Sequence, residues 1–410
     1  MISFLNFISG WVILLLGLAL SIGLHEVGHL WPAKKFGVKV TKYMIGFGPT
    51  LFSRKRGDTE YGIKAIPLGG YIQMIGMIPP ASAFKTAGFR NRGNEEDISS
   101  EDQDRTFYRL KPWKKLIIMF GGPFANLVIA LVLAFVLFCG FGNYGRTTTI
   151  NQIVPCIPTT ANPNCDKVGD PSPSVIAGLK AGDKILEING TKVTLWSDVE
   201  PILKTTVGKL TSIKVLRANV EQTFSITPVT LNLEGSSRPY LGVYLKADRI
   251  QQTPVGAVFQ LGSMLVSTAE LIVQLPMQAV SAFGEMNPGT PRNQNGAISI
   301  IGLGQFSGEI AASSDIPLED KVASQLSLLM SLNVALFVFN MIPLVPLDGG
   351  HIAAGIYEWI KRGIWRIRGK TLEEPVDTSK MMPIAYFVAG LLLLLSLILI
   401  VRDIVNPFHI

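Results

Sequence analysis

The chain opens with a membrane-length run that carries no charged residue and ends in a metal-binding pattern. Residues 1–24 contain no Asp, Glu, Lys or Arg, and His25-Glu26-Val27-Gly28-His29 follows directly. On a helix, His25 and His29 lie one turn apart on one face, where both rings can bind a zinc ion, and Glu26 lies beside them, where it can take a proton from metal-bound water. Because ionisable side chains at membrane depth are costly, the pattern favours a functional site over a chance match.

Three further uncharged runs, at 116–145, 322–347 and 381–401, are long enough to cross a bilayer, which needs about 20 apolar residues. The composition agrees, because 48% of the residues are hydrophobic and only 16% are charged. The first run lacks the basic start and small-residue exit of a cleaved signal peptide, so we interpret it as a retained span. We therefore expect a polytopic α-helical membrane protein with four transmembrane helices, at 1–31, 114–141, 322–350 and 381–402.

Charge is divided unevenly among the loops. Residues 31–115 hold 16 Lys and Arg against 8 Asp and Glu, residues 141–321 hold 14 against 15, and residues 349–381 hold 6 against 4. By the positive-inside rule, the loops at 32–113 and 351–380 are cytoplasmic and the long middle loop is extracytoplasmic. We expect a multi-pass protein of the cell (plasma or inner) membrane. No nucleic-acid partner is expected, because the basic residues flank the spans.

The segment 250–285 has a composition that could upset this topology. It is largely uncharged, but its polar residues recur every three or four positions and so form a stripe along one face of a helix. Val258, Phe259, Leu265, Val266 and Ile272 fall on the other face. This pattern predicts an amphipathic helix that lies against the membrane or the other spans rather than crossing.

Asp348 is our candidate for the third ligand, because a catalytic zinc ion takes three protein ligands and a water. It ends the predicted third span, as His25 and His29 end the first. If both spans run inward, the three side chains reach a similar depth near the cytoplasmic face, which requires an even number of crossings between them. His351 is a possible alternative ligand, and His409 lies almost at the C-terminus.

The residues before and after Asp348 suit an active site. Pro343 and Pro346 break a helix and leave carbonyl groups that must face a polar cavity or other protein. The glycines at 349–350 allow close approach of the backbone. Asn340 could hold a substrate main chain through its amide, although a packed amide at a helix kink is the alternative.

These motifs give the chain a family resemblance. HEVGH at 25–29 and N-x-x-P-x-x-P-L-D-G-G at 340–350, together with GPFAN at 122–126 and IGFGP at 45–49, resemble the site-2 protease family of M50-type intramembrane zinc metalloproteases, in the bacterial single-PDZ form similar to the regulator-of-sigma protease. Nearly the whole length is covered. The resemblance implies Zn²⁺ ligated by His25, His29 and Asp348, with Glu26 as the general base.

The resemblance also implies a substrate class. Relatives of this type cleave single-span membrane proteins within or near the transmembrane segment, often anti-sigma factors that another protease has already clipped outside, in regulated intramembrane proteolysis. This chain has one PDZ copy where some relatives have two, so substrate gating inferred from the two-PDZ form does not carry over. Two other classes stay open: a catalytically silent PDZ scaffold, against which the complete metal and base residues argue, and a metal or solute transporter, against which the lack of an internal repeat argues.

The first cytoplasmic loop, 32–113, contains a β-rich stretch. Short β-type runs between residues 43 and 77 are punctuated by Gly, Pro and the turn-like 56–58, which predicts hairpins. In the family such a segment dips into the membrane and offers a strand edge to an unwound substrate, which makes Gly69 and Gly70 candidate substrate-binding residues beside Asn340. The alternative is an ordinary cytoplasmic β-subdomain. Residues 80–105 are rich in polar and acidic residues and predict a flexible linker.

The extracytoplasmic region is predicted to hold a Cys-containing loop at 142–165 and a PDZ-like domain at 166–247. Residues 174–190, SVIAGLKAGDKILEING, look like a bacterial PDZ core, which receives a peptide or protein ligand as an added strand beside a helix. A generic small β-rich domain is the alternative. Cys156 and Cys165 lie on the side where disulfides persist, so we predict that they are bridged. Cys139 falls within the second span and packs as a small apolar residue.

Overall fold

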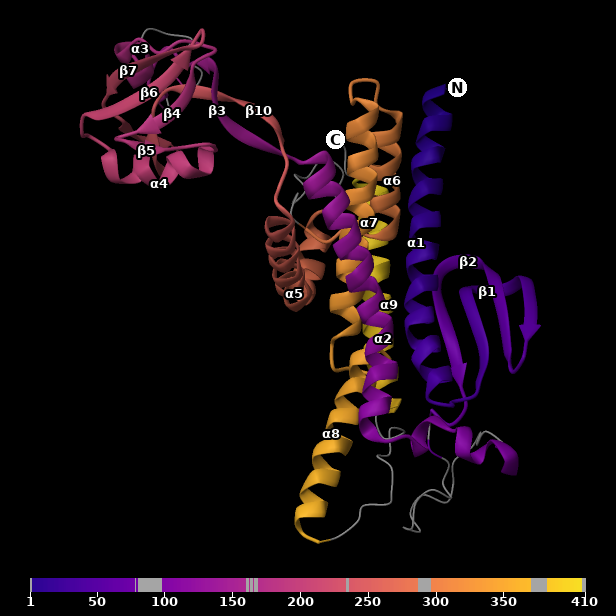
Figure 1. Ribbon diagram of the computed structural model, residues 1–410. Coiled ribbons are helices and arrows are strands. Elements are labelled where there is room, and N and C mark those ends of the chain that lie inside the picture. Colours follow the sequence, from indigo (N-terminus) through magenta and orange to yellow (C-terminus); the bar gives the residue numbers. More distant parts are fainter. Residues whose placement is uncertain are drawn as a thin grey trace. The chain divides into compact units, whose positions relative to one another are not determined.

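The computed structural model describes residues 2–77, 79, 98–159, 162, 165, 169–233, 236–286, 296–369 and 382–407. The chain divides into two compact units (Figure 1). One comprises Met1–Cys139 with Thr253–Ile410, and the other comprises Gly140–Gln252. The first unit is mainly helical and the second is mainly β-sheet.

The helical unit contains the candidate membrane spans. Its helices are α1 (Ile2–Lys35), α2 (Pro112–Ala134, continued by a π-helix over Phe135–Phe141), α5 (Pro254–Gly284), α6 (Ile300–Ala312), α7 (Leu318–Asn340), α8 (Asp348–Ile367) and α9 (Met382–Val405). Within the described part of the chain, five helices are long and apolar enough to cross a membrane, namely α1, α2 with its π-helical continuation, α5, α7 and α9. Four of them correspond to the predicted spans, and α5 is the additional one.

The prediction of one helix over 322–350 followed by a loop from 351 is wrong. Helix α7 ends at Asn340, and a separate helix, α8, begins at Asp348 and continues to Ile367. The break has a physical cause, because Pro343 and Pro346 remove backbone donors in the intervening segment. Asp348 therefore begins a helix instead of ending a span. The rest of the predicted loop, 370–381, lies outside the described residues.

Close contacts place α2 and α7 beside α1, and the contacts of α7 also give its direction relative to α1. Gly28 of α1 meets Gly121 of α2 so closely that an added Cβ would lie 2.2 Å from the Gly121 carbonyl oxygen. Farther up α1, a Cβ on Gly17 would meet the Leu329 side chain, and Asn333 of α7 donates a hydrogen bond to Ser21. Helix α7 is therefore parallel to α1, and it carries the chain toward Asp348 at the depth of His25 and His29.

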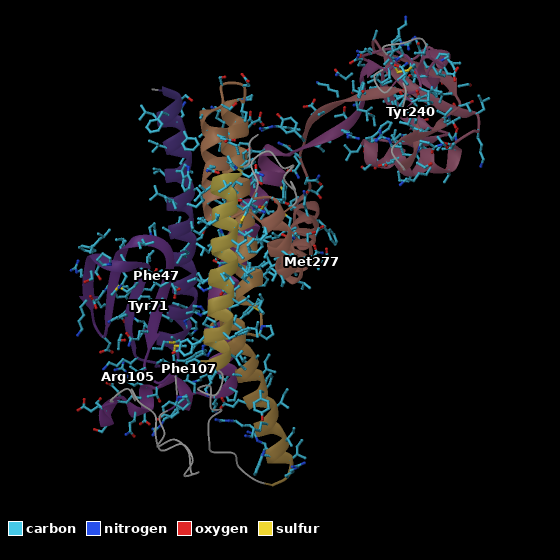
Figure 2. All side chains as sticks on the ribbon, turned by 180° about the vertical axis from the view of Figure 1, so that it is seen from behind. Phe47, Tyr71, Arg105, Phe107, Tyr240 and Met277 are labelled. Atoms are coloured by element: carbon cyan, nitrogen blue, oxygen red, sulfur yellow. A yellow bond between two sulfur atoms is a disulfide. The ribbon has the colours of Figure 1, made fainter. Side chains whose placement is uncertain are left out.

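Helix α5 buries only a narrow face. Ala257 and Leu261 pack in a cluster with the end of α2 and the middle of α7, and Ala279 and Ala282 are also buried. Other apolar side chains of α5 are exposed, including Met277 (Figure 2). Most of the predicted polar stripe is also exposed or half-buried. The buried face is thus a third face, between the two that the sequence pattern distinguished.

The β-rich stretch in the first loop forms a folded hairpin. Strand β1 (Val40–Arg56) pairs antiparallel with β2 (Thr59–Met74), and both strands double back, so residues 43–45 pair with 61–63 on one side and with 70–72 on the other. Phe47 and Tyr71 lie on this sheet (Figure 2). Part of the predicted linker is ordered: a 3-10 helix over Ser100–Arg105 makes ion pairs with Lys39 and Asp58. Residues 80–97 of that linker lie outside the described residues.

The second unit is a small sheet domain with its own core. Its five main strands follow the order β10-β3-β4-β6-β7, and the short β5 pairs with β4. These strands are β3 (Asn143–Ile153), β4 (Lys184–Ile188), β5 (Thr191–Lys192), β6 (Thr211–Arg217), β7 (Val220–Ile226) and β10 (Val243–Ile250). Helices α3 (Pro173–Ala177) and α4 (Trp196–Thr206) and a separate hairpin, β8 (Val229–Leu233) with β9 (Ser236–Tyr240), complete it.

Two features of this unit bear on the predicted Cys-containing loop. Strand β3 lies within 142–165 and pairs with both β10 and β4, so this part of the predicted loop belongs to the sheet. Cys156 and Cys165 form a disulfide with a Cα–Cα distance of 5.7 Å. The predicted start of the domain at residue 166 is therefore too late, because it leaves out strand β3, the first strand of the sheet.

Candidate metal centre

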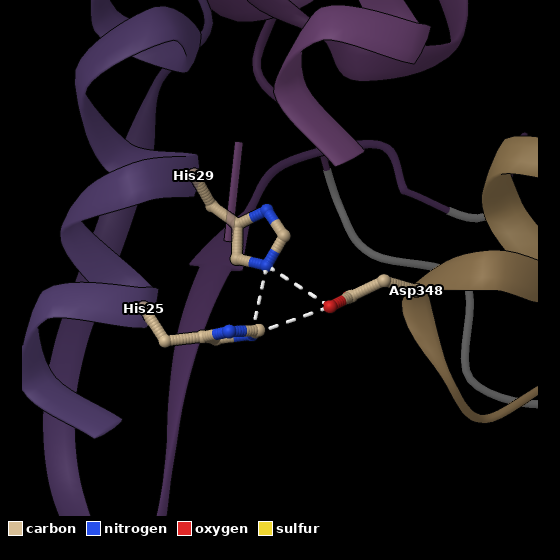
Figure 3. A group of neighbouring side chains, drawn as sticks. All are labelled: His25, His29 and Asp348. Carbon is tan, nitrogen blue, oxygen red and sulfur yellow. Dashed lines mark hydrogen bonds and ion pairs between the residues drawn. The ribbon is translucent and has the colours of Figure 1, made fainter. Parts of the chain in front are cut away.

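Three side chains from distant parts of the sequence converge on one point (Figure 3). His25 Nε2 and His29 Nε2 lie 3.2 Å apart, and Asp348 Oδ2 lies 3.2 Å from the first and 3.3 Å from the second. His25 and His29 come from α1, and Asp348 is the first residue of α8. These are the three metal ligands that the sequence predicts, and within the described residues they form the one cluster of His, Cys, Asp or Glu that could hold a metal ion.

The spacing of the three ligand atoms fits a tetrahedral zinc site. Bonds of about 2.0–2.1 Å from zinc to nitrogen or oxygen place neighbouring ligand atoms about 3.3–3.4 Å apart, close to the separations found here. Asp348 Oδ2 is also buried without a hydrogen-bond partner in the described part of the chain. Such an oxygen is costly unless it is paired, and a cation between it and the two imidazoles would pair it.

Helix α2 holds the far side of both imidazole rings. His29 Nδ1 lies 2.7 Å from the carbonyl oxygen of Ile118, and His25 Nδ1 lies 3.0 Å from Nδ2 of Asn126. The close approach that permits these contacts depends on glycine, because a Cβ on Gly122 would lie 2.1 Å from His29 Nε2. Partners of this kind orient metal-binding histidines and select their tautomer.

The ligands open into a cavity of about 590 Å³. Glu26, the predicted base, lines it and is 7% exposed. The predicted substrate-binding residues Asn340, Gly69 and Gly70 line it as well. A Cβ on Gly70 would lie 3.0 Å from Cγ of Glu26, so the end of β2 passes directly over the base. The structure thus brings all seven predicted active-site residues to one cavity.

Neither of the other two histidines, His351 and His409, is found among the three converging ligands in the described part of the chain. His351 lines the same cavity but is not one of the three converging ligands. His409 lies outside the described residues. Asn126, Gly122 and the Ile118 carbonyl were not predicted as parts of the site. Two signals were available: Asn126 is a polar side chain inside an apolar span, and Gly122 and Asn126 are the first and last residues of the GPFAN motif that contributes to the family resemblance.

Comparison with known proteins gives the family. Residues 13–382 match the model of peptidase family M50. The chain is similar to zinc metalloprotease Rip1 of Mycolicibacterium smegmatis, with 31% identity over 422 residues, which cover 98% of each chain. It is 30% identical to zinc metalloprotease Rip1 of Mycobacterium bovis over 98% of this chain and 99% of that one. It is 27% identical to metalloprotease MmpA of Caulobacter vibrioides over 87% of this chain and 88% of that protein.

Family and geometry agree on the chemistry of the site. The family model matches most of the chain. The structure has an HExxH helix whose two imidazoles lie within 3.3 Å of a carboxylate oxygen from a distant part of the sequence. Among the described residues, five helices have the length and composition of membrane spans. The chain therefore belongs to peptidase family M50 and is a zinc metalloprotease of the membrane.

Proposed function

We propose that the enzyme hydrolyses peptide bonds within or near the transmembrane segments of single-span membrane proteins, with anti-sigma factors as a candidate substrate class. The observation that carries this proposal is the position of the cavity. His25, Glu26 and His29 are buried on α1, a helix of membrane-spanning length, and Asp348 follows the spanning-length helix α7 after a short segment. A substrate bond must therefore enter the helical unit to reach them.

The roles of the residues follow from this arrangement. His25, His29 and Asp348 would hold zinc, which when bound acidifies a water molecule and polarises a carbonyl group. Glu26 lies beside the ligands and would take the water proton and pass it to the leaving nitrogen. Asn340, at the end of α7, has an amide that can bind the substrate main chain.

A strand edge beside the base supports binding of an extended substrate. Residues 70–72 pair with 43–45 on one side and form an outer strand of the folded hairpin. Gly69, Gly70, Tyr71 and Ile72 also line the cavity. A helical transmembrane segment has its carbonyl groups masked by internal hydrogen bonds, so it must unwind before hydrolysis. An outer strand offers replacement main-chain hydrogen bonds to the unwound segment.

Contacts at the two ends of α5 support a helix that does not cross the membrane. Its first turns contribute Ala257 and Leu261 to the buried cluster that also contains Leu137 and Phe138 at the end of α2. At its other end, Glu285 pairs with Arg402 near the end of α9. With the basic loops on the cytoplasmic side, α2 and α9 both end on the extracytoplasmic side, so both ends of α5 lie there. The even number of crossings between His29 and Asp348 is then preserved, and the active site faces the cytoplasmic half.

The sheet unit offers a groove for a peptide ligand, as a PDZ-like domain would. Strand β10 is at the edge of its sheet. A cavity of about 460 Å³ is lined by residues 241–245 at the start of this strand and by Trp196, Glu200 and Leu203 of α4. An extended peptide or protein segment could add to β10 beside α4. By the same charge rule, this unit is extracytoplasmic.

The Glu26→Gln variant tests the proposed function. We expect wild-type zinc content and a loss of at least about 100-fold in cleavage, since a general base contributes typically 10²–10⁴-fold. Cleavage would be measured on a single-span substrate in proteoliposomes, with Glu270→Gln on α5 as the matched control. Wild-type cleavage by Glu26→Gln would remove Glu26 from the mechanism. Cleavage of soluble peptides alone by the wild type would contradict the intramembrane substrate.

A further inference from the structure

Asn126 is a fully buried polar side chain inside α2 that contacts one metal ligand. Its exposed fraction is 0%, and its Nδ2 lies 3.0 Å from Nδ1 of His25, on the side of the ring away from Asp348. Its Oδ1 is buried and has no hydrogen-bond partner among the described residues. A buried amide is costly unless its polar atoms are hydrogen-bonded, and His25 is the partner within reach.

The neighbouring ligand shows what a metal-binding imidazole needs. His29 Nδ1 lies 2.7 Å from the Ile118 carbonyl oxygen, which can only accept a hydrogen bond, so Nδ1 carries the proton. Nε2 of His29, which faces Asp348, is thereby left with a free lone pair. Ile118 and Asn126 are eight residues apart on α2 and so lie near the same face of that helix.

His25 has two possible proton arrangements, and Asn126 can serve either. If the amide nitrogen donates to a bare Nδ1, the proton of a neutral ring is on Nε2, which then cannot bind a cation. If the amide turns by half a rotation about its Cβ–Cγ bond, its oxygen accepts from Nδ1–H and the Nε2 lone pair is free. Only the second arrangement makes His25 equivalent to His29.

We propose that Asn126 is a positioning residue that prepares His25 for zinc by presenting its amide oxygen to Nδ1–H. The inference rests on the zinc site formed by His25, His29 and Asp348. Helix α2 then orients both imidazoles, through a backbone carbonyl for His29 and through a side-chain carbonyl for His25. A hydrogen bond of this kind fixes the ring orientation and raises the basicity of the ligand.

Two substitutions at Asn126 separate this role from simple packing. Asn126→Leu keeps the number and branching of the side-chain heavy atoms but has no acceptor, and we expect its zinc affinity to fall about 10–100-fold, as for other partners of ligating histidines. The ionised carboxylate of Asn126→Asp is an acceptor only, so it can accept from Nδ1–H but cannot donate to a bare Nδ1. We expect it to retain most of the wild-type affinity.

The measurement is competition between purified full-length protein and a chelator for zinc, together with the melting temperature of each variant. Asn333→Leu is the matched control, because Asn333 is a fully buried asparagine of α7 that bonds Ser21 and Leu329 and no metal ligand. We expect this control to lower the melting temperature without changing zinc affinity. His25→Ala defines the loss expected when a ligand is removed.

The outcomes distinguish the inference from the site on which it rests. Wild-type affinity in Asn126→Leu, with a large loss in His25→Ala, would overturn the role of Asn126 and leave the zinc site intact. A loss in Asn126→Asp as large as that in Asn126→Leu would also overturn it, because the amide would then act as a donor or only as packing. Unchanged affinity in His25→Ala would overturn the zinc site, and the inference with it.

Discussion

At the scale of single residues, the centre depends on how closely α2 can approach α1. Gly122 lies against the His29 ring, and that ring cannot easily retreat because its Nδ1 is bonded to Ile118. We predict that Gly122→Ala lowers zinc affinity by about 10-fold or more, comparable to the loss of a partner of a ligating histidine. Chelator competition measures this, with Gly262→Ala as control, because a Cβ there meets no atom within 4 Å. Equal affinities in the two variants would contradict the steric argument.

The ligand residues could be predicted from the sequence, whereas their supporting residues could not. His25 and His29 are linked by helical spacing alone, and Asp348 was linked to them by the depth at which the third span was predicted to end. The contact between Asn126 and His25 joins positions that are 101 residues apart. It depends on where two apolar helices cross, and nothing in their apolar sequences specifies that crossing point. A polar residue such as Asn126 in a span indicates a functional position, but the sequence does not show which side chain it contacts.

At the scale of elements, α8 must be held in place because Asp348 is its first residue. Nearly three turns further along, Glu358 accepts a hydrogen bond from Lys115 of α2 at 2.7 Å and forms an ion pair with Arg362 at 2.6 Å. The side chains of Glu358 and Lys115 are only 3% and 8% exposed. This buried pair ties the start of α2 to α8, 243 residues later in the chain.

We predict that Glu358→Leu is strongly destabilising, because it leaves the buried Lys115 ammonium without its carboxylate partner. Removal of one partner of a buried pair costs about 3–5 kcal/mol. The double variant Lys115→Met with Glu358→Leu should recover much of the loss, since a packed apolar pair needs no charge compensation. Melting temperatures of the purified variants test both expectations. A double variant as unstable as the single one would show that packing, not the stranded charge, is responsible.

The boundaries of these elements were the weakest part of the sequence prediction. Hydrophobic length alone predicted a single helix to residue 350, although Pro343 and Pro346 were recognised as helix breakers. The new helix at Asp348 was missed although the sequence indicates it, since Ile352, Ile356, Ile360 and Ile364 recur at the four-residue spacing of an amphipathic helix. The folded hairpin was better predicted, since its turns are marked by Gly and Pro.

At the scale of the whole molecule, the two units have separate cores and separate stabilising pairs. The core of the sheet unit consists of its own residues, such as Ile185, Ile213 and Val215. Its first strand was missed in the sequence because β3 is separated by about 30 residues from β4, with the disulfide loop between them. Because each unit has a hydrophobic core of its own, zinc binding in the helical unit and stability of the sheet unit can be measured separately.

Asp183 provides a pH-dependent test of whether the sheet unit can be destabilised without affecting the helical unit. Burial acts to raise the pKa of its carboxyl group, but hydrogen bonds from Arg217, at 2.7 Å, and from the Lys180 backbone outweigh burial and hold the pKa below its ordinary value. The ionised carboxylate therefore stabilises the folded unit at pH values above the pKa of the unfolded chain, and this contribution is lost as the pH falls through the lower folded-state pKa. At neutral pH, Asp183→Asn should cost about 1.5–3 kcal/mol, the range for hydrogen bonds to a charged group.

Hydrogen exchange in the full-length protein measures this effect. At pH 7 we expect Asp183→Asn to exchange faster than the wild type across 140–252 and no faster across α1, α2 and α7. As the pH is lowered through the folded-state pKa of Asp183, the difference should shrink, because the wild-type carboxyl group also becomes neutral. Glu221→Gln is the control, since its ion pair with Lys214 is exposed and long, at 3.8 Å, and such pairs contribute little. A difference that persists unchanged in acid would exclude the charge of Asp183 as its cause, and faster exchange in α1 would contradict the independence of the units.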